Sequence, residues 1–348
     1  MRVGVLCLLA GWSLLAAGSD AWPGRASPEA WTARMSTLRP ETRARMIREA
    51  DEALSRPPRP VVTLASAGSD DLSDPRVAAT RAAFEDADDA VILAMAWQIS
   101  GKAAYRAAAV RRLDAWATTC VPTGNPVDET RLDGLVHAWM LVKDTLAPAE
   151  EAVIRGWLEE LRTQKRAWRF GPRTASNNHR THQLKMLLLL DRALDDDVAF
   201  EADRAQAEAH AARNLDAQTG ESVDLLERRA LYYHAYDLDA WLEIELVTGC
   251  CTAPVTAAYR LLERRLRLGE TGGEFVGSEV PLDAARSRSG YGYGSAGSTF
   301  DPERAEHAIL AFYTGEPTRG DPFASGLLTQ PVQRRNLYAL ARYESWAR

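Results

Sequence analysis

The sequence predicts an all-α fold in a single large domain. Apolar residues recur at helical spacing along most of the chain, connectors are short, and an alternating strand pattern is almost absent. Hydrophobic residues make up 46% of the 348 residues, which is enough for a sizeable core. Helix pairs recur at roughly the spacing of helical-hairpin repeats. Periodicity alone leaves a closed or partly closed ring of hairpins and an open solenoid as alternatives.

The predicted helices have recognisable start and stop signals. A helix over 28–53 ends at the proline-rich sequence 56–60, and Asp74 caps a second helix that begins at Pro75 and ends at Gly101. Acidic residues at the start favour a helix over 148–168. The other helices are predicted over 103–119, 130–145, 176–190, 196–215, 222–247, 254–268, 302–313 and 331–343. Between them, 61–75 is predicted to be a loop or lid, and 269–299, with its glycine–tyrosine repeat 290–294, a flexible connector.

Residues 1–21 have the features of a secretory signal peptide. Arg2 precedes an apolar stretch over 3–17 that is too short to span a bilayer. We therefore expect a mature domain over 22–348, periplasmic or secreted and not bound to a membrane once the signal is removed. A formal net charge of −6 argues against nucleic acid as a partner. We expect no cofactor and no metal, and a monomer.

Three cysteines remain after removal of the signal: Cys120, Cys250 and Cys251. An oxidising compartment would allow one disulfide, from Cys120 to either of the other two. Adjacent cysteines seldom bridge to each other, so the pairing stays open.

The sequence Ser176-Asn177-Asn178-His179 predicts an anion site at a helix start. Ser176 is the predicted cap, and the following amides and imidazole lie where free N–H groups and the helix dipole favour negative charge. The span 161–190 contains basic residues and no Asp or Glu. These are Arg162, Lys165, Arg166, Arg169, Arg173, Arg180 and Lys185. A carboxylate-bearing substrate is the functional interpretation, and a solvated basic face is the alternative.

A second informative stretch runs from Asp224 to Trp241. On one continuous helix, Arg229 and Tyr236 would be two turns apart on one face, with Tyr232 or Tyr233 between them. A nearby arginine lowers the pKa of a phenol, which is useful where a phenolate must take a proton. The alternative is that these tyrosines only pack the helix into the core.

Together the two stretches resemble the alginate lyase family, polysaccharide lyases with a helical toroid fold. The resemblance rests on Asn177-Asn178-His179 followed by Arg-Ala-Leu-x-Tyr-His-x-Tyr ending at Tyr236. Flanking matches lie at 122–130 and at 273–278 with Asp283 and Arg286, so it extends over 74–313. It implies an (α/α) toroid, an incomplete barrel of helical hairpins, acting on anionic polysaccharides such as alginate.

The resemblance also implies roles for individual residues. It assigns His179 and Tyr236 to proton transfer and Asn178 and Arg229 to the substrate carboxylate, with Arg228 competing with Arg229 for that place. The further substrate contacts predicted are Arg228, Asn177, Tyr233, His234, His182 and Arg180. The basic run over 162–173 is then a hypothetical track for the polymer.

β-Elimination explains why such residues are needed. The C5 proton of a 4-linked uronate is weakly acidic until the adjacent carboxylate is neutralised, and a base and an acid must then act at C5 and O4. In β-mannuronate and β-glucuronate these groups lie on one side of the ring, so one tyrosine could serve both. Polymannuronate is the expected substrate. Glucuronan is an alternative. His179 would polarise the carboxylate, or act as the base on a residue of opposite C5 configuration such as guluronate.

Two other functions remain open. Carboxylates at Asp224, Glu227, Asp239 and Glu243 could serve a glycoside hydrolase, and the same scaffold could bind a polysaccharide without cleaving it.

Among the remaining histidines, His137 is predicted to lie in the core and His307 at the surface.

Overall fold

The computed structural model describes residues 28–65, 73–289, 295–314, 319–329 and 331–346. Helices dominate these residues, which contain no strand and only two isolated bridges, Leu215 with Ser222 and Glu274 with Ser298. The all-α prediction is confirmed. The predicted signal peptide and the 290–294 repeat lie outside the described residues, as does 66–72 of the predicted 61–75 loop. Among described helices, none is long and apolar enough to cross a membrane.

The helices follow one another with short connectors. In chain order they are α1 (Pro28–Met35), α2 (Pro40–Ser55), α3 (Pro75–Ser100), α4 (Ala103–Thr119), η2 (Thr130–Leu132), α5 (Asp133–Val142), η3 (Lys143–Thr145), α6 (Pro148–Ala167), α7 (Asn178–Ala193), α8 (Asp197–Asn214), α9 (Val223–Arg228), α10 (Leu231–Thr248), α11 (Thr252–Leu268), α12 (Pro281–Ser289), η4 (Pro302–Ala305), α13 (Glu306–Tyr313), η6 (Arg334–Asn336) and α14 (Leu337–Trp346).

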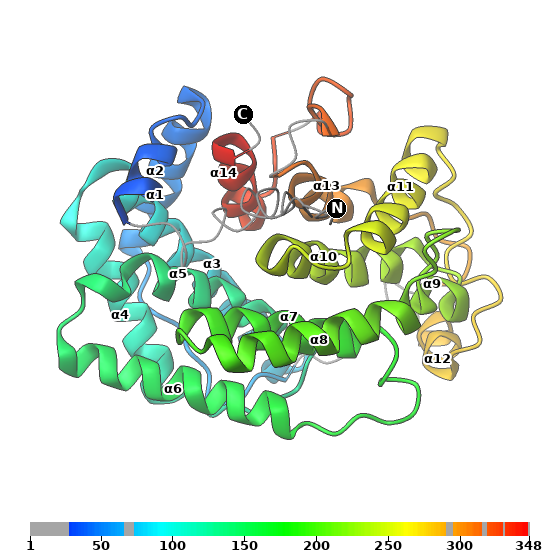
Figure 1. The fold of residues 1–348 in the computed structure, drawn as a ribbon, viewed down its shortest axis with the longest axis horizontal. Helices are drawn as coiled ribbons and strands as arrows, with labels where there is room; N and C mark the ends of the chain where they lie inside the picture. The colour runs from blue at the N-terminus through cyan, green and yellow to red at the C-terminus, as the bar shows by residue number, and fades with distance from the viewer. Residues whose placement is uncertain (1–27, 66–72, 290–294, 315–318, 330, 347–348) are drawn as a thin grey trace, which may run out of the picture.

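The helices form a toroid with an inner and an outer set. The inner helices α3, α5, α7, α10, α13 and α14 contact one another in that order, and α14 packs back against α3 and α1 (Figure 1). The outer helices α2, α4, α6, α8 and α11 cover them. The chain's first and last described helices therefore meet, which confirms the ring of hairpins and rejects the open solenoid.

The two sets differ in how their side chains are buried. In the inner helix α7, the run 186–190 is buried on every side because the helix lies between ring neighbours and the outer layer. The outer helix α6 instead buries one stripe, including Ile154, Trp157 and Leu161. The core thus lies between the two sets and leaves the inner face of the ring to polar side chains.

Several helix boundaries differ from the prediction. The predicted helix over 28–53 is two helices, because Pro40 disfavours helical backbone in the residue before it and opens α2. Asn177, not Ser176, caps α7, since its Oδ1 accepts from the backbone N–H of His179 at 3.1 Å. Helix α12 was missed inside a segment predicted to be a connector.

The most consequential difference is a break in the predicted helix over 222–247. Arg229 adopts a left-handed conformation with φ of 52°, which ends α9, and α10 starts at Leu231. The segment around Glu274 fixes the break. The carboxylate of Glu274 accepts from the backbone N–H groups of Leu231 and Tyr232, at 2.7 and 2.9 Å, and Phe275 N–H donates to the Arg229 carbonyl. Arg229 and Tyr236 therefore do not share one helix face.

Candidate functional site

Two adjoining cavities lie on the inner face of the ring. The smaller, of about 280 Å³, is lined by Asn178, His179, Arg228, Tyr233 and Arg286, among others, and is called the His179 cavity. The larger, of about 440 Å³, contains His307 and is called the His307 cavity. Both are lined by Arg81, Thr130, Arg131, Tyr232 and Tyr236. Because they share these residues, they form one continuous cleft, with Tyr236 at the junction.

The start of α7 presents Asn178 to the cleft in a fixed orientation. Its backbone N–H donates to Asp224 Oδ2 at 2.7 Å, and its Nδ2 donates to Asp224 Oδ1. Both residues are 1% exposed. Burial raises the pKa of Asp224 to about 6. Asp224, considered from the sequence only as a hydrolase carboxylate, is thus the residue that orients the amide.

His179 is an uncharged imidazole at neutral pH. Burial and the Arg228 charge lower its pKa to about 4. Its Nδ1 lies 3.1 Å from Asn177 Oδ1, and because that oxygen accepts, Nδ1 carries the proton. The lone pair is therefore on Nε2, so His179 is equipped to accept a proton. Asn177 itself serves as the cap and lines neither cavity.

Arg228, and not Arg229, is the arginine of the cleft. The Arg228 guanidinium lies over the Tyr233 ring, with Cζ 3.3 Å from the ring centroid, and pairs with the buried Asp283. Its Nε is buried without a hydrogen-bond partner among the described residues. Arg229 is exposed beyond the helix break and lines neither cavity. The prediction that Arg229 faces the site with Tyr236 is wrong.

A segment further along the chain holds Arg228 and Tyr233 in place at the His179 cavity. Ser278 donates to Asp283 at 2.6 Å, and Arg286 Nη1 donates to the Tyr233 hydroxyl at 2.7 Å. Arg286 is 4% exposed and lines the His179 cavity. The segment 273–286 therefore holds Arg228 and Tyr233 in place. It also fixes the start of α10, as described above.

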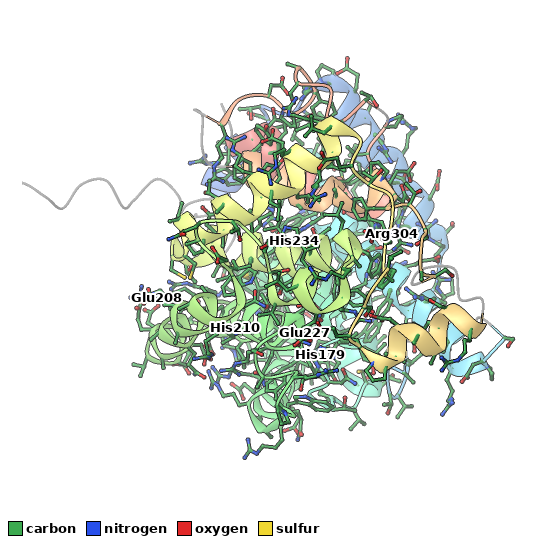
Figure 2. All side chains as sticks on the ribbon, turned by 90° about the vertical axis from the view of Figure 1, so that its right-hand side faces the viewer. His179, Glu208, His210, Glu227, His234 and Arg304 are labelled. Atoms are coloured by element: carbon green, nitrogen blue, oxygen red, sulfur yellow. The ribbon has the colours of Figure 1, made fainter. Side chains whose placement is uncertain are left out.

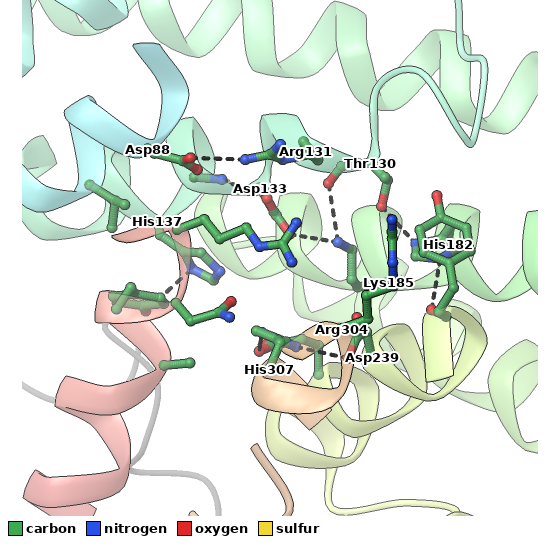
Figure 3. A pocket seen from close by; sticks show the side chains of 18 of the residues that line it. Asp88, Thr130, Arg131, Asp133, His137, His182, Lys185, Asp239, Arg304 and His307 are labelled. Carbon is green, nitrogen blue, oxygen red and sulfur yellow. Dashed lines mark hydrogen bonds and ion pairs between the residues drawn. The ribbon is translucent and has the colours of Figure 1, made fainter. Parts of the chain in front are cut away.

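His182 positions Tyr236. The two rings pack with centroids 4.1 Å apart. His182 Nε2 lies 3.1 Å from the Tyr236 carbonyl and must donate to it, so Nδ1 accepts from the Thr130 hydroxyl at 2.7 Å. Burial lowers the pKa of His182, which keeps this neutral form. Figure 3 shows the His182 ring between Thr130 and α10 with both bonds as dashed lines. His182 lines the cleft as predicted, but both ring nitrogens are used by the protein.

Two predicted substrate contacts lie elsewhere. Arg180 lines neither cavity and bonds Gln183 and Gln206, on the side of α7 that faces α8. His234 is 1% exposed and bridges Ser222 Oγ, at 3.0 Å, to the Ala258 carbonyl, at 3.1 Å. Arg180 therefore lies away from the cleft. His234 cannot contact a ligand there, because the face of α10 that carries it packs on α11.

The basic run is largely neutralised by residues that the fold brings to it. Arg162 pairs with Asp191 and Asp196, and Arg166 with Asp191 and Asp203. Two lysines are paired as well: Lys165 with Glu129 at 3.0 Å, and Lys185 with Asp133 at 2.6 Å. Of the run, only Lys185 lines a cavity. Ion pairs within the protein therefore occupy Arg162, Lys165 and Arg166, whereas Arg169 and Arg173 are exposed outside the cleft and stay a predicted track for the polymer.

The His307 cavity contains alternating charges. Asp88 pairs with Arg131 at 2.8 Å, and His307 Nε2 lies 3.0 Å from Glu243 and its Nδ1 3.5 Å from Asp239 (Figure 3). Burial opposes the charge on His307, but the bonds to Asp239 and Glu243 outweigh it and raise its pKa to about 9. His307 was predicted at the surface and instead supplies a cation to the cleft.

Sequence spacing could have identified Lys185. It follows Asn178 and His182 at intervals of one helical turn, which puts all three on one face of α7. Arg131 and Arg286 come from segments with no such link to α7, so only the fold brings them together. Among the described residues, no group of three or more His, Cys, Asp or Glu side chains could hold a metal ion.

Comparison with known proteins gives one consistent result. A model of the alginate lyase family matches residues 49–247. Among solved structures, an alginate lyase from Bacteroides ovatus has a TM-score of 0.62 at 13% identity, covering 92% of this chain and 98% of its own. A histidine-to-alanine form of alginate lyase A1-III complexed with tetrasaccharide has a TM-score of 0.65 at 13% identity, covering 96% and 99%. A1-III from Sphingomonas species A1 scores 0.55 at 14% identity, covering 85% and 97%. No curated protein matches.

Proposed function

The chain belongs to the alginate lyase family, and from that premise we propose that this polysaccharide lyase cleaves polymannuronate blocks of alginate by β-elimination at Tyr236. The observation that carries the proposal is the cleft that joins Tyr236, His179, Asn178 and Arg228. Solved relatives in complex with tetrasaccharide support an anionic oligosaccharide as the ligand.

The first task of the site is to neutralise the substrate carboxylate. Arg228 lines the cavity, and its guanidinium is held there by Asp283 and by the ring of Tyr233. The Asn178 amide is fixed by Asp224, and one Nδ2 hydrogen remains for the ligand. Donors fixed in this way stabilise the enolate-like state formed when the C5 proton leaves.

The second task is proton transfer. The Tyr236 ring is held by His182 at the junction of the two cavities, where a sugar could lie with C5 and O4 near one phenol. In β-mannuronate this hydroxyl can take the C5 proton and return a proton to the departing O4. His179, neutral and with its lone pair on Nε2, suits removal of a C5 proton from the opposite face. His179 fits the structure less well as a hydrogen-bond donor to the carboxylate, because its Nε2 carries no proton.

A hydrolase mechanism is disfavoured by the state of the carboxylates. Asp224 is occupied by Asn178, and Asp239 and Glu243 lie against His307. Glu243 also pairs with Arg342. A glycosidase needs one carboxyl free to donate a proton to the bridging oxygen and a second free to act on the sugar.

Polymer choice is the finer part of the proposal. Mannuronate and glucuronate differ only at C2, so the elimination machinery treats them alike and other contacts must discriminate. Glucuronan with the same mechanism is therefore the second candidate.

Incubation with polymannuronate, polyguluronate and glucuronan tests the proposal. We expect ultraviolet absorbance of unsaturated uronate ends to rise fastest with polymannuronate. New reducing ends without that absorbance would indicate hydrolysis, and neither signal on any of the three polymers would indicate a binding protein. A rate on glucuronan above that on polymannuronate would transfer the assignment to glucuronan.

We further propose that the enzyme is exported to the periplasm or outside the cell, on the strength of the signal-like pattern over 1–21, and that it acts there as the monomer expected above. Expression of the full chain, cell fractionation and N-terminal sequencing test this. Intact residues 1–21 on cytosolic protein would contradict export, and light scattering would detect a dimer.

A further inference from the structure

The corner between α10 and α11 brings two sulfur atoms together. Cys250 and Cys251 follow Gly249 directly, and their Sγ atoms lie 2.9 Å apart. Gly249 and Cys251 both have left-handed backbone, with φ of 68° and 64°. A non-glycine residue in this conformation is uncommon, and such strain often marks a functional position. The conformation turns neighbouring side chains, which usually diverge, toward each other.

The pair is accessible from a cavity separate from the cleft. A hollow of about 440 Å³ is lined by Cys250 and Cys251 together with α8 residues that include Arg204 and Glu208. Glu208 lies at the edge of the molecule and apart from His179 (Figure 2). Cys251 is half-buried and Cys250 is 8% exposed. A small thiol reagent can therefore approach the pair without entering the substrate cleft.

The two sulfurs share a hydrogen bond and lie near a charged pair. The hydrogen bond with Cys251 lowers the pKa of Cys250, and the same bond raises the pKa of Cys251. Arg204 adds a favourable charge and Glu208 an opposing one, and these two are paired with each other at 2.7 Å. Either sulfur can donate in this hydrogen bond, so each thiol can stabilise the thiolate of the other, as in dithiols that exchange with disulfides.

We propose that Cys250 and Cys251 form a reversible redox pair that closes to a vicinal disulfide by exchange with a small-molecule disulfide. The thiolate of one cysteine attacks the oxidant, forming a mixed disulfide and releasing one thiolate. The other cysteine then loses its proton and attacks the sulfur of the first, which releases the second thiolate. The pair loses two electrons and two protons overall, and the oxidant becomes two thiols. This inference does not depend on the lyase assignment.

Cys120 provides an internal control. It is 5% exposed, lines none of the three cavities, and burial raises its pKa to about 12. All three cysteines are free in the structure, so neither predicted disulfide to Cys120 is present.

Tryptic peptide mapping tests the proposal on the full chain. Peptide 230–260 contains both cysteines of the pair, and 113–131 contains Cys120. After reduction, exposure to oxidised glutathione and alkylation, we expect 230–260 to lack two hydrogens and carry no label. Cys120 should react at least about tenfold more slowly. Reduction should restore two labels.

Variants separate the two steps. Cys251→Ser and Cys250→Ser should each stop at a glutathione adduct on the remaining cysteine of the pair, and Cys120→Ser should behave like the parent. The proposal is overturned if 230–260 keeps two alkylated thiols, if the adduct persists in the parent, or if Cys120 is consumed first.

Discussion

The layer where α6 and α8 pack on α7 and the inner cleft both contain arginines paired with carboxylates, but they differ in whether the arginines line a cavity. In the layer, Arg162 and Arg166 join three helices through Asp191 and its neighbours, and neither lines a cavity described above. In the cleft, Arg228 is paired with Asp283 and lines a cavity. The comparison indicates that concavity, rather than the density of basic residues in the sequence, identifies the site.

Among the arginine substitutions, the largest functional effect should separate two adjacent arginines. Arg228→Lys keeps a charge near Asp283 but removes Nε and the planar fork, so kcat/KM on polymannuronate should fall about 100-fold. Arg229→Lys, at an exposed position, should change it less than about twofold. Steady-state kinetics of folded proteins checks both. The reverse ranking would return the carboxylate role to Arg229.

Ion pairs made by α6 should contribute to stability rather than to catalysis. Lys165 and Glu129 are 0% and 2% exposed, so Lys165→Met leaves a buried carboxylate unpaired and should cost about 3 kcal/mol in the free energy of unfolding. Denaturant unfolding measures this, with exposed Arg169→Met as the unchanged control. The kcat of the folded variant should stay near the parent value, and a large fall in it would tie the layer to catalysis.

Asp224 links pH to the orientation of Asn178. Its pKa is raised to about 6, so it takes a proton as the pH falls through that value and holds Asn178 less well. The kcat should show an acid limb near there, and Asp224→Asn should lower kcat about tenfold at higher pH and remove the limb. His179, with a pKa of about 4, is neutral on both sides of that limb. An unchanged limb in the variant would assign it to another group.

The raised pKa of Asp224 also makes the free energy of unfolding depend on pH. Because the folded-state pKa of Asp224 lies above its ordinary value of 3.8, the folded state binds more protons between these values. The cost of burying the ionised carboxylate is present above about pH 6 and is relieved as the pH falls toward 4.

The smallest effect is expected in the exposed part of the basic run. Arg169 and Arg173 are exposed and line neither cavity of the cleft. Reversal of both charges, Arg169→Glu with Arg173→Glu, should change polymer affinity less than about twofold at physiological salt. Affinity electrophoresis checks this, and a tenfold loss would support the polymer track along this surface.

Sequence reasoning predicted the all-α ring and the part of the site carried by local motifs. Asn178 and His179 lie at a recognisable helix start, and Tyr236 ends a distinctive motif. The errors arose where distant segments decide local geometry. Glu274 breaks the helix at Arg229 and thereby exchanges the roles of two adjacent arginines.

The charge of the basic run was misjudged for a related reason. Asp191 and Asp203 follow the run in sequence, and only the packing of α6, α7 and α8 brings them onto it. His307 shows the converse, since carboxylates from α10 convert a histidine predicted at the surface into a partly buried cation that lines the cleft. No spacing rule within one helix contains this information.

The most direct test of the central claim, that Tyr236 carries the proton in an elimination within this cleft, is Tyr236→Phe assayed on polymannuronate. The phenyl ring keeps the packing against His182, so we predict loss of unsaturated product by at least about 1,000-fold with polymer affinity within about twofold of the parent. Full activity in Tyr236→Phe would contradict the account and move the search to His179 and Tyr233.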